Sequence, residues 1–197
     1  MKDAVNDINY MKKLLMIGIL LTLLCAPSEA HQKIRDVFIQ MPESLLPYLT
    51  ENNRLDFLDF MDSNMKAEVH NELGGKSEML SLTDESLALQ LSHSLKVEMR
   101  LVPVAEAVDS CQQVVCMIST YGTDAPESKI EVYSVKWNPV DVSAHLSLPE
   151  GPYIAEFKEA THPSVGLSLR KVNALDPIAF EEQKEEFLWL KYIEWKP

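Results

Sequence analysis

The feature that most constrains this fold is the spacing of apolar residues after position 78. They stand at every second position in three successive runs, Leu80–Leu82, Leu87–Leu91 and Leu95–Leu101. Alternation with a period of two is typical of strands that bury one face. The gaps between the runs are only three or four residues long, too short for a crossover helix. Consecutive strands are therefore predicted to pair as antiparallel hairpins.

The same pattern continues toward the C-terminus. Val114–Tyr121 and Lys129–Trp137 complete a predicted meander of five strands. The segment Pro139–Pro152 has broken alternation and is expected to form an irregular edge. Further strands are predicted, in chain order, at Tyr153–Phe157, Gly166–Val172 and Phe187–Trp195.

Residues 34–75 have helical spacing instead. A short helix is predicted from four apolar residues at i, i+3, i+4 and i+7, which are Ile34, Val37, Phe38 and Met41. A second helix of about 20 residues is expected to be capped by Asn53 and ended by Gly74-Gly75. Its apolar stripe would comprise Phe57, Leu58, Met61, Met65, Val69 and Leu73. We therefore expect an α+β fold with N-terminal helices packed on a mostly antiparallel meander sheet.

The first thirty residues are interpreted as a secretory signal peptide. Lys12 and Lys13 precede an apolar run of eleven residues, Leu14–Leu24, whereas a membrane-spanning helix needs about 20. Ser28 and Ala30 are the small residues expected just before a cleavage site. This predicts a signal peptide over residues 1–30, a single α+β domain over 31–197 and no transmembrane anchor after cleavage. Lipidation at Cys25 is the alternative.

The net charge of the protein makes one class of partner, nucleic acid, unfavourable. Lys and Arg number 18 against 30 Asp and Glu, which gives a net charge of -12 and makes this an acidic protein. Such a surface repels phosphate backbones, so nucleic acid is not an expected partner. Together with the signal peptide, the composition predicts an acidic exported protein.

Two cysteines remain after the predicted cleavage site, Cys111 and Cys116. An oxidising envelope permits a disulfide between them. On a straight strand, however, five residues span about 16 Å and place the two side chains on opposite faces. A disulfide would need a bulge or turn between them. A disulfide and two packed thiols are therefore both left open.

Long phrases of the chain resemble a known group of proteins. The segments MPESLLPYLTENNRLDFLDFMDSNMKAEVHNELGGKSEM and TDESLALQLS, after an exported start, resemble a family of secreted proteins of unknown function from Bacteroidetes-type anaerobic bacteria. The resemblance covers nearly the whole mature chain. It implies an exported protein in the periplasm of a diderm bacterium or associated with its outer membrane. It implies no activity, and so no functional residues.

No metal, cofactor or catalytic motif emerges from the residues. Asp56, Asp59 and Asp62 recur along one side of the second predicted helix, yet they lack the loop of a calcium site and are interpreted as a solvated face. The histidines lack the spacing that binds zinc; they are His31, His70, His93, His145 and His162. We predict no cofactor.

Aromatic residues give the one candidate binding surface. The candidate residues for a groove that takes a peptide or glycan are Trp137, Trp189, Tyr192 and Trp195, together with Tyr133. Aromatic side chains are more often part of a core. The leading hypothesis is a non-catalytic binding or scaffolding module that contacts a protein, peptide or glycan of the cell envelope. The alternative is an envelope hydrolase whose carboxylates come from distant segments.

Overall fold

The computed structural model describes residues 32–148, 150–157, 166–171 and 190–194, with side chains described up to residue 157 except 144. All of these belong to one compact unit, residues 32–197. The helices are α2 (Ile34–Ile39), η1 (Glu43–Leu45), α3 (Glu51–Asp62) and η2 (Val142–Ala144). The strands are β1 (Glu68–His70), β2 (Lys76–Leu82), β3 (Ser86–Ser92), β4 (Leu95–Val108), β5 (Cys111–Tyr121), β6 (Glu127–Ser134), β7 (Pro139–Val140), β8 (Tyr153–Phe157), β9 (Gly166–Lys171) and β10 (Leu190–Glu194).

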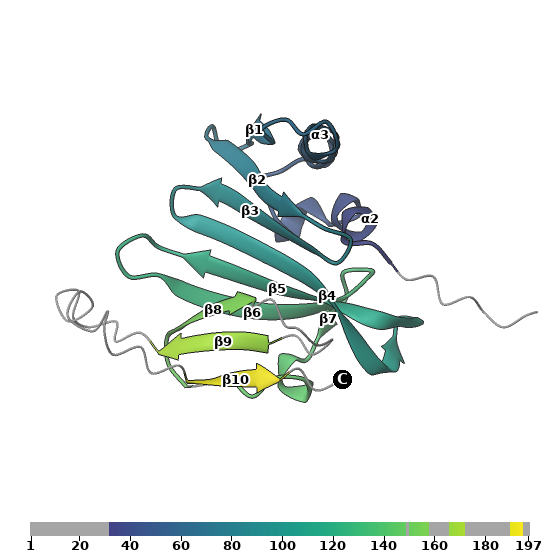
Figure 1. The fold of residues 1–197 in the computed structure, drawn as a ribbon, viewed down its shortest axis with the longest axis vertical. Coiled ribbons are helices and arrows are strands. Elements are labelled where there is room, and N and C mark those ends of the chain that lie inside the picture. The colour runs from purple at the N-terminus through teal and green to yellow at the C-terminus, as the bar shows by residue number, and fades with distance from the viewer. Residues whose placement is uncertain (1–31, 149, 158–165, 172–189, 195–197) are drawn as a thin grey trace, which may run out of the picture. The chain divides into compact units, whose positions relative to one another are not determined.

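Strands β1 to β7 form one antiparallel sheet in chain order, so the predicted meander is confirmed and extended at both ends (Figure 1). The expectation of a mostly antiparallel sheet with N-terminal helices holds. The three later strands do not join this sheet, however. They form a second antiparallel sheet in the order β10-β9-β8.

The two faces of the large sheet are covered differently. One face, here called the helix face, packs under α2 and α3 in a core that includes Phe38, Phe57 and Leu89. The other, here called the β8 face, has a second core in which Val102 and Ile130 pack with Ala155 of β8. Because alternate residues point to opposite faces, the helix-face residues of β3 and β4 are the predicted apolar ones.

A bulge in β2 changes which leucine is buried. The register with β3 shifts between Met79 and Ser81, which leaves Leu80 48% exposed while Met79 is buried. Leu82 then packs against the helix-face core. The prediction that Leu80 and Leu82 share one buried face is therefore wrong, because a bulge inserts one residue into the alternation.

Helix α3 is shorter than predicted. It has twelve residues, and its N-cap is Thr50, whose hydroxyl accepts a hydrogen bond from the Asn53 amide in a capping box. The helix ends where Asn64 adopts a left-handed backbone, φ 53°. Val69 then pairs with Ser77 in the β1–β2 hairpin. The helical spacing of apolar residues continues to Leu73, but the chain is not helical there. The backbone of β1 forms its hydrogen bonds with β2 instead.

Gly74 has a role in that hairpin rather than at a helix end. Its φ is 80°, and its amide donates to the Asn71 carbonyl across the turn. The buried Asn71 side chain accepts from the Gly75 amide and donates to Ser77 Oγ. A left-handed position suits glycine at little steric cost.

Long-range hydrogen bonds fix the short helix α2 to the rest of the domain. Carbonyl groups at the end of a helix have no partner within it. Here the Trp137 indole Nε1–H donates to the Val37 carbonyl at 2.9 Å, and the buried Arg54 guanidinium donates to the Ile39 carbonyl at 3.2 Å. Trp137 has a φ of 66° and is only 6% exposed. It is therefore an anchor inside the helix-face core.

The cysteines lie on opposite faces of β5. Both are free thiols in the structure, so of the two alternatives it has the packed thiols. Cys116 is buried in the β8-face core, whereas Cys111 is partly buried at the helix-face core. Burial raises the pKa of the Cys116 thiol to about 12, because desolvation disfavours the thiolate.

Replacing Trp137 with Phe should destabilise the protein by about 1–3 kcal/mol, because the Val37 carbonyl is left buried without a donor. Urea unfolding followed by circular dichroism measures the change. Tyr133→Phe is the matched control, since it removes a hydroxyl that contacts the half-buried Glu131. Equal stability of the two variants would contradict the anchoring role.

Alkylation should separate the two thiols. Iodoacetamide at pH 8 should modify Cys111 in the native protein, and Cys116 only after unfolding, because the thiolate is the reactive form and Cys116 is buried. Peptide mass spectrometry before and after adding guanidinium measures this. Resistance of both thiols until a reductant is added would show a disulfide instead.

Candidate functional site

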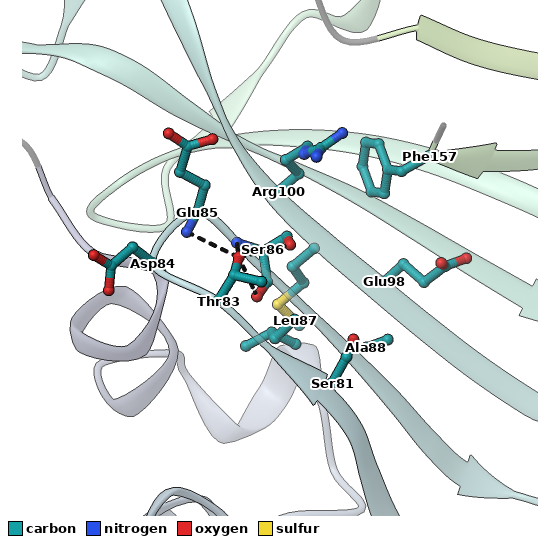
Figure 2. Close-up of a pocket in the computed structure, with 11 residues that line it drawn as sticks. Ser81, Thr83, Asp84, Glu85, Ser86, Leu87, Ala88, Glu98, Arg100 and Phe157 are labelled. Carbon is teal, nitrogen blue, oxygen red and sulfur yellow. Dashed lines mark hydrogen bonds between the residues drawn. The ribbon is translucent and has the colours of Figure 1, made fainter. Parts of the chain in front are cut away.

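The β8 face is hollowed where the core under β8 ends. The cavity has a volume of about 500 Å³ and is lined by Ser81, Thr83, Asp84, Glu85, Ser86, Leu87, Ala88, Glu98, Met99, Arg100 and Phe157 (Figure 2). These residues come from β2, the β2–β3 turn, β3, β4 and the end of β8. The hollow therefore joins residues that lie far apart in the sequence.

Strand pairing gives the hollow its floor. Ala88 lies directly opposite Glu98, and Ser86 lies opposite Arg100, in the register of β3 with β4. These four side chains are half-buried. The small side chains on β3 leave room above the sheet, while Phe157 bounds the hollow on the β8 side.

The β2–β3 turn forms one rim and is held by a hydroxyl. Thr83 Oγ1 accepts from the amides of Glu85 at 3.2 Å and Ser86 at 2.9 Å. The Thr83 amide in turn donates to the Ser86 carbonyl. A turn with this many internal hydrogen bonds presents Asp84 and Glu85 from a defined backbone.

Charged side chains of both signs line the hollow. Asp84 pairs with Lys33 at 3.2 Å, and Glu98 pairs with Lys96 at 3.1 Å. The Arg100 guanidinium lies over the Phe157 ring, 5.8 Å from its centroid. Figure 2 shows Arg100, Phe157 and Glu98 on the same side of the hollow. The site can thus offer donors, acceptors and an aromatic surface to a polar ligand.

Two of the aromatic residues expected in a groove lie in the core instead. Trp137 and Tyr133 are buried together in the helix-face core, with ring centroids 5.6 Å apart. Trp189 and Trp195 lie outside the described residues, and Tyr192 is in β10, where only the backbone is described. A groove made by these aromatic residues stays a prediction.

Sequence reasoning missed the residues of the hollow for a physical reason. Glu98 and Arg100 occupy the polar positions of an alternating strand, which look like an ordinary solvent face. Phe157 follows Arg100 by 57 residues, so only the tertiary fold brings the two together. A small Ala88 opposite a charged residue was the one local signal.

The described residues hold no cluster of three metal-binding side chains. Asp62, one of the three regularly spaced helix carboxylates, accepts a hydrogen bond from Arg35 at 2.6 Å instead. Within the described part of the chain, no helix has the length and apolar character needed to cross a membrane.

Comparisons with known proteins agree with the fold and name no activity. A family described as "Protein of unknown function (DUF3256)" matches residues 27–180. A domain of an uncharacterised protein from Porphyromonas gingivalis W83 has a similar structure, with a TM-score of 0.58 and 21% identity over 80% of this chain and 86% of that chain. At this identity the likeness shows the fold alone, and no curated protein matches. The chain therefore belongs to the DUF3256 family of proteins of unknown function.

Proposed function

We propose that this protein is exported to the cell envelope and binds a peptide in the hollow of the β8 face. The observation that carries the binding part is the half-covered sheet. Strand β8 packs over β5 and β6, while the same face of β3 and the start of β4 is left with half-buried polar side chains around the cavity. A cavity of about 500 Å³ falls within the usual size of ligand sites, about 300–1,000 Å³.

The lining favours a charged ligand over a lipid. Seven of the eleven lining residues are polar or charged, whereas a site for an acyl chain is predominantly apolar. Desolvating such groups is costly unless a ligand replaces their hydrogen bonds. Side chains of opposite sign, such as Glu98 and Arg100, suit the charges of a peptide better than the hydroxyls of a neutral glycan.

Binding is also favoured over the alternative, hydrolysis by paired carboxylates. A general acid needs a raised pKa. The carboxyl groups of Glu68, Asp109 and Asp141 have pKa values below their usual range, because each accepts hydrogen bonds. In the hollow, Asp84 forms an ion pair with Lys33 at 3.2 Å, and Glu98 forms one with Lys96 at 3.1 Å.

The cellular location rests on the sequence alone. The apolar run Leu14–Leu24 and the small residues before position 31 are the features of a cleaved leader. The family match covers residues 27–180, which lie after the apolar run. These features support export of the folded part as an envelope protein.

Filling the hollow should weaken peptide binding. We would select peptides against the protein from a random display library and measure their affinity by isothermal titration calorimetry. Ala88→Trp should weaken binding at least tenfold, because Ala88 lies on the floor of the cavity. Ala107→Trp, at an exposed position of β4, is the matched control. Peptides that bind both variants equally well would place binding elsewhere and overturn the proposal.

Export is tested by fractionating cells that express the full chain. The periplasmic or outer-membrane fraction should contain a form that begins at His31, as shown by N-terminal sequencing. Leu20→Arg should keep the chain uncleaved in the cytosol, because a charge in the middle of the apolar run blocks its recognition as a signal. Recovery of the uncleaved wild-type chain in the cytosol would refute export.

A further inference from the structure

We infer that Arg100, Glu98 and Phe157 form a subsite for an α-amino-acid head group, a carboxylate and an ammonium on one carbon atom. This inference rests on the proposed function, because it names the chemistry that the hollow recognises. It applies to a free amino acid and to a diamino acid built into a peptide through its side chain. Both sources present the same head group.

The cation of the subsite is held in place by an aromatic ring. The Arg100 guanidinium lies 5.8 Å from the centroid of Phe157, at a distance where the ring attracts a cation. A guanidinium is planar and has five N–H donors. This number is enough to hold a carboxylate as well as to make contacts within the protein. A planar fork of donors matches the two oxygens of a carboxylate.

The carboxylate of the subsite comes from the same strand. Glu98 and Arg100 are two residues apart on β4, so their side chains leave the same face about 7 Å apart. Lys96 bonds to Oε2 of Glu98 at 3.1 Å. A carboxylate has about four acceptor positions on its two oxygens, so Glu98 can also accept from an ammonium group.

A small head group with both charges suits this arrangement. Glu98 and Arg100 leave the same face of β4 two residues apart. A ligand that has an ammonium and a carboxylate on one carbon atom presents a partner for each side chain, through charge-assisted hydrogen bonds of about 2.7–2.9 Å. A ligand with both charges gains a charge-assisted hydrogen bond at each of the two half-buried side chains, whereas a ligand with only one charge gains a single such bond.

Protein charge argues against a purely anionic ligand. The net charge of -12 repels anions over the whole surface, and three carboxylates line the hollow, those of Asp84, Glu85 and Glu98. A zwitterion has no net charge. It therefore avoids this repulsion while it engages Arg100.

The test uses four probes and nuclear magnetic resonance of the full protein. Nε-acetyllysine has the head group and an amide-linked side chain, and glycine has the head group alone. Nα,Nε-diacetyllysine keeps only the carboxylate, and Nε-acetyllysinamide keeps only the ammonium. We expect saturable shifts of the Arg100 Nε–H and Phe157 ring signals with a zwitterionic probe, and at least tenfold weaker binding of both single-charge probes.

Substitutions of Arg100 and Glu98 test whether each side chain binds one charge of the probe. R100Q and E98Q should each weaken binding of the zwitterionic probe at least tenfold. E131Q, on the helix face, should leave that binding unchanged. Circular dichroism checks that each variant folds, and the loss of selectivity between probes gives a readout that unfolding does not mimic. If Nε-acetyllysine binds more tightly than glycine, the ligand is a diamino acid linked to a peptide. If the two bind equally, the ligand is a free amino acid. Both results support the inference.

Three results would overturn the inference: no saturable shifts with any probe up to about 10 mM, equal binding of a single-charge probe, or unchanged binding by R100Q. Its failure is distinguishable from failure of the proposed function. If displayed peptides lose affinity for Ala88→Trp while the probes do not bind, the hollow binds peptides through another chemistry. If Ala88→Trp has no effect, the hollow itself is not the site.

Discussion

The rest of the structure depends on burying one face of the meander under the N-terminal helices. The apolar side chains of β3 and β4 that point to the helix face can leave water only when α2 and α3 cover them. Helix α2 has six residues, too few for a stable isolated helix. Its position therefore relies on packing and on the bonds that Trp137 and Arg54 make to its final carbonyl groups.

Once the helix face is covered, the opposite face is the one that holds the proposed ligand site. Strand β8 adds a second apolar core over β5 and β6, and the amide of Ala155 donates to Ser128 Oγ to join the two layers. Among the residues that the structure describes, β8 ends at Phe157, whose ring lies under the Arg100 guanidinium of β4. The hollow lies next to the end of β8, so the proposed binding surface follows from the unequal areas of the two layers.

Local pattern predicted the regular parts of this fold, and long-range contacts determined the rest. The hairpins from β3 to β6 follow from alternation and short gaps. The β2 bulge at residues 79–81 and the end of α3 at Asn64 do not, because each reflects competition between pairings. The candidate site has the same limit. The sequence alone does not show whether an aromatic residue such as Trp137 lies in a core or in a groove. Phe157 comes close to Arg100 only when the chain folds.

The bond between Val37 and Trp137 joins positions 100 residues apart. During synthesis, the segment that becomes α2 leaves the ribosome long before its partner exists. Contacts of such high sequence separation form late and slow the folding of small domains. The apolar side of α2 is therefore uncovered for much of translation, when incomplete chains are most prone to aggregate. A chaperone that shields nascent hydrophobic segments would act on this protein through α2.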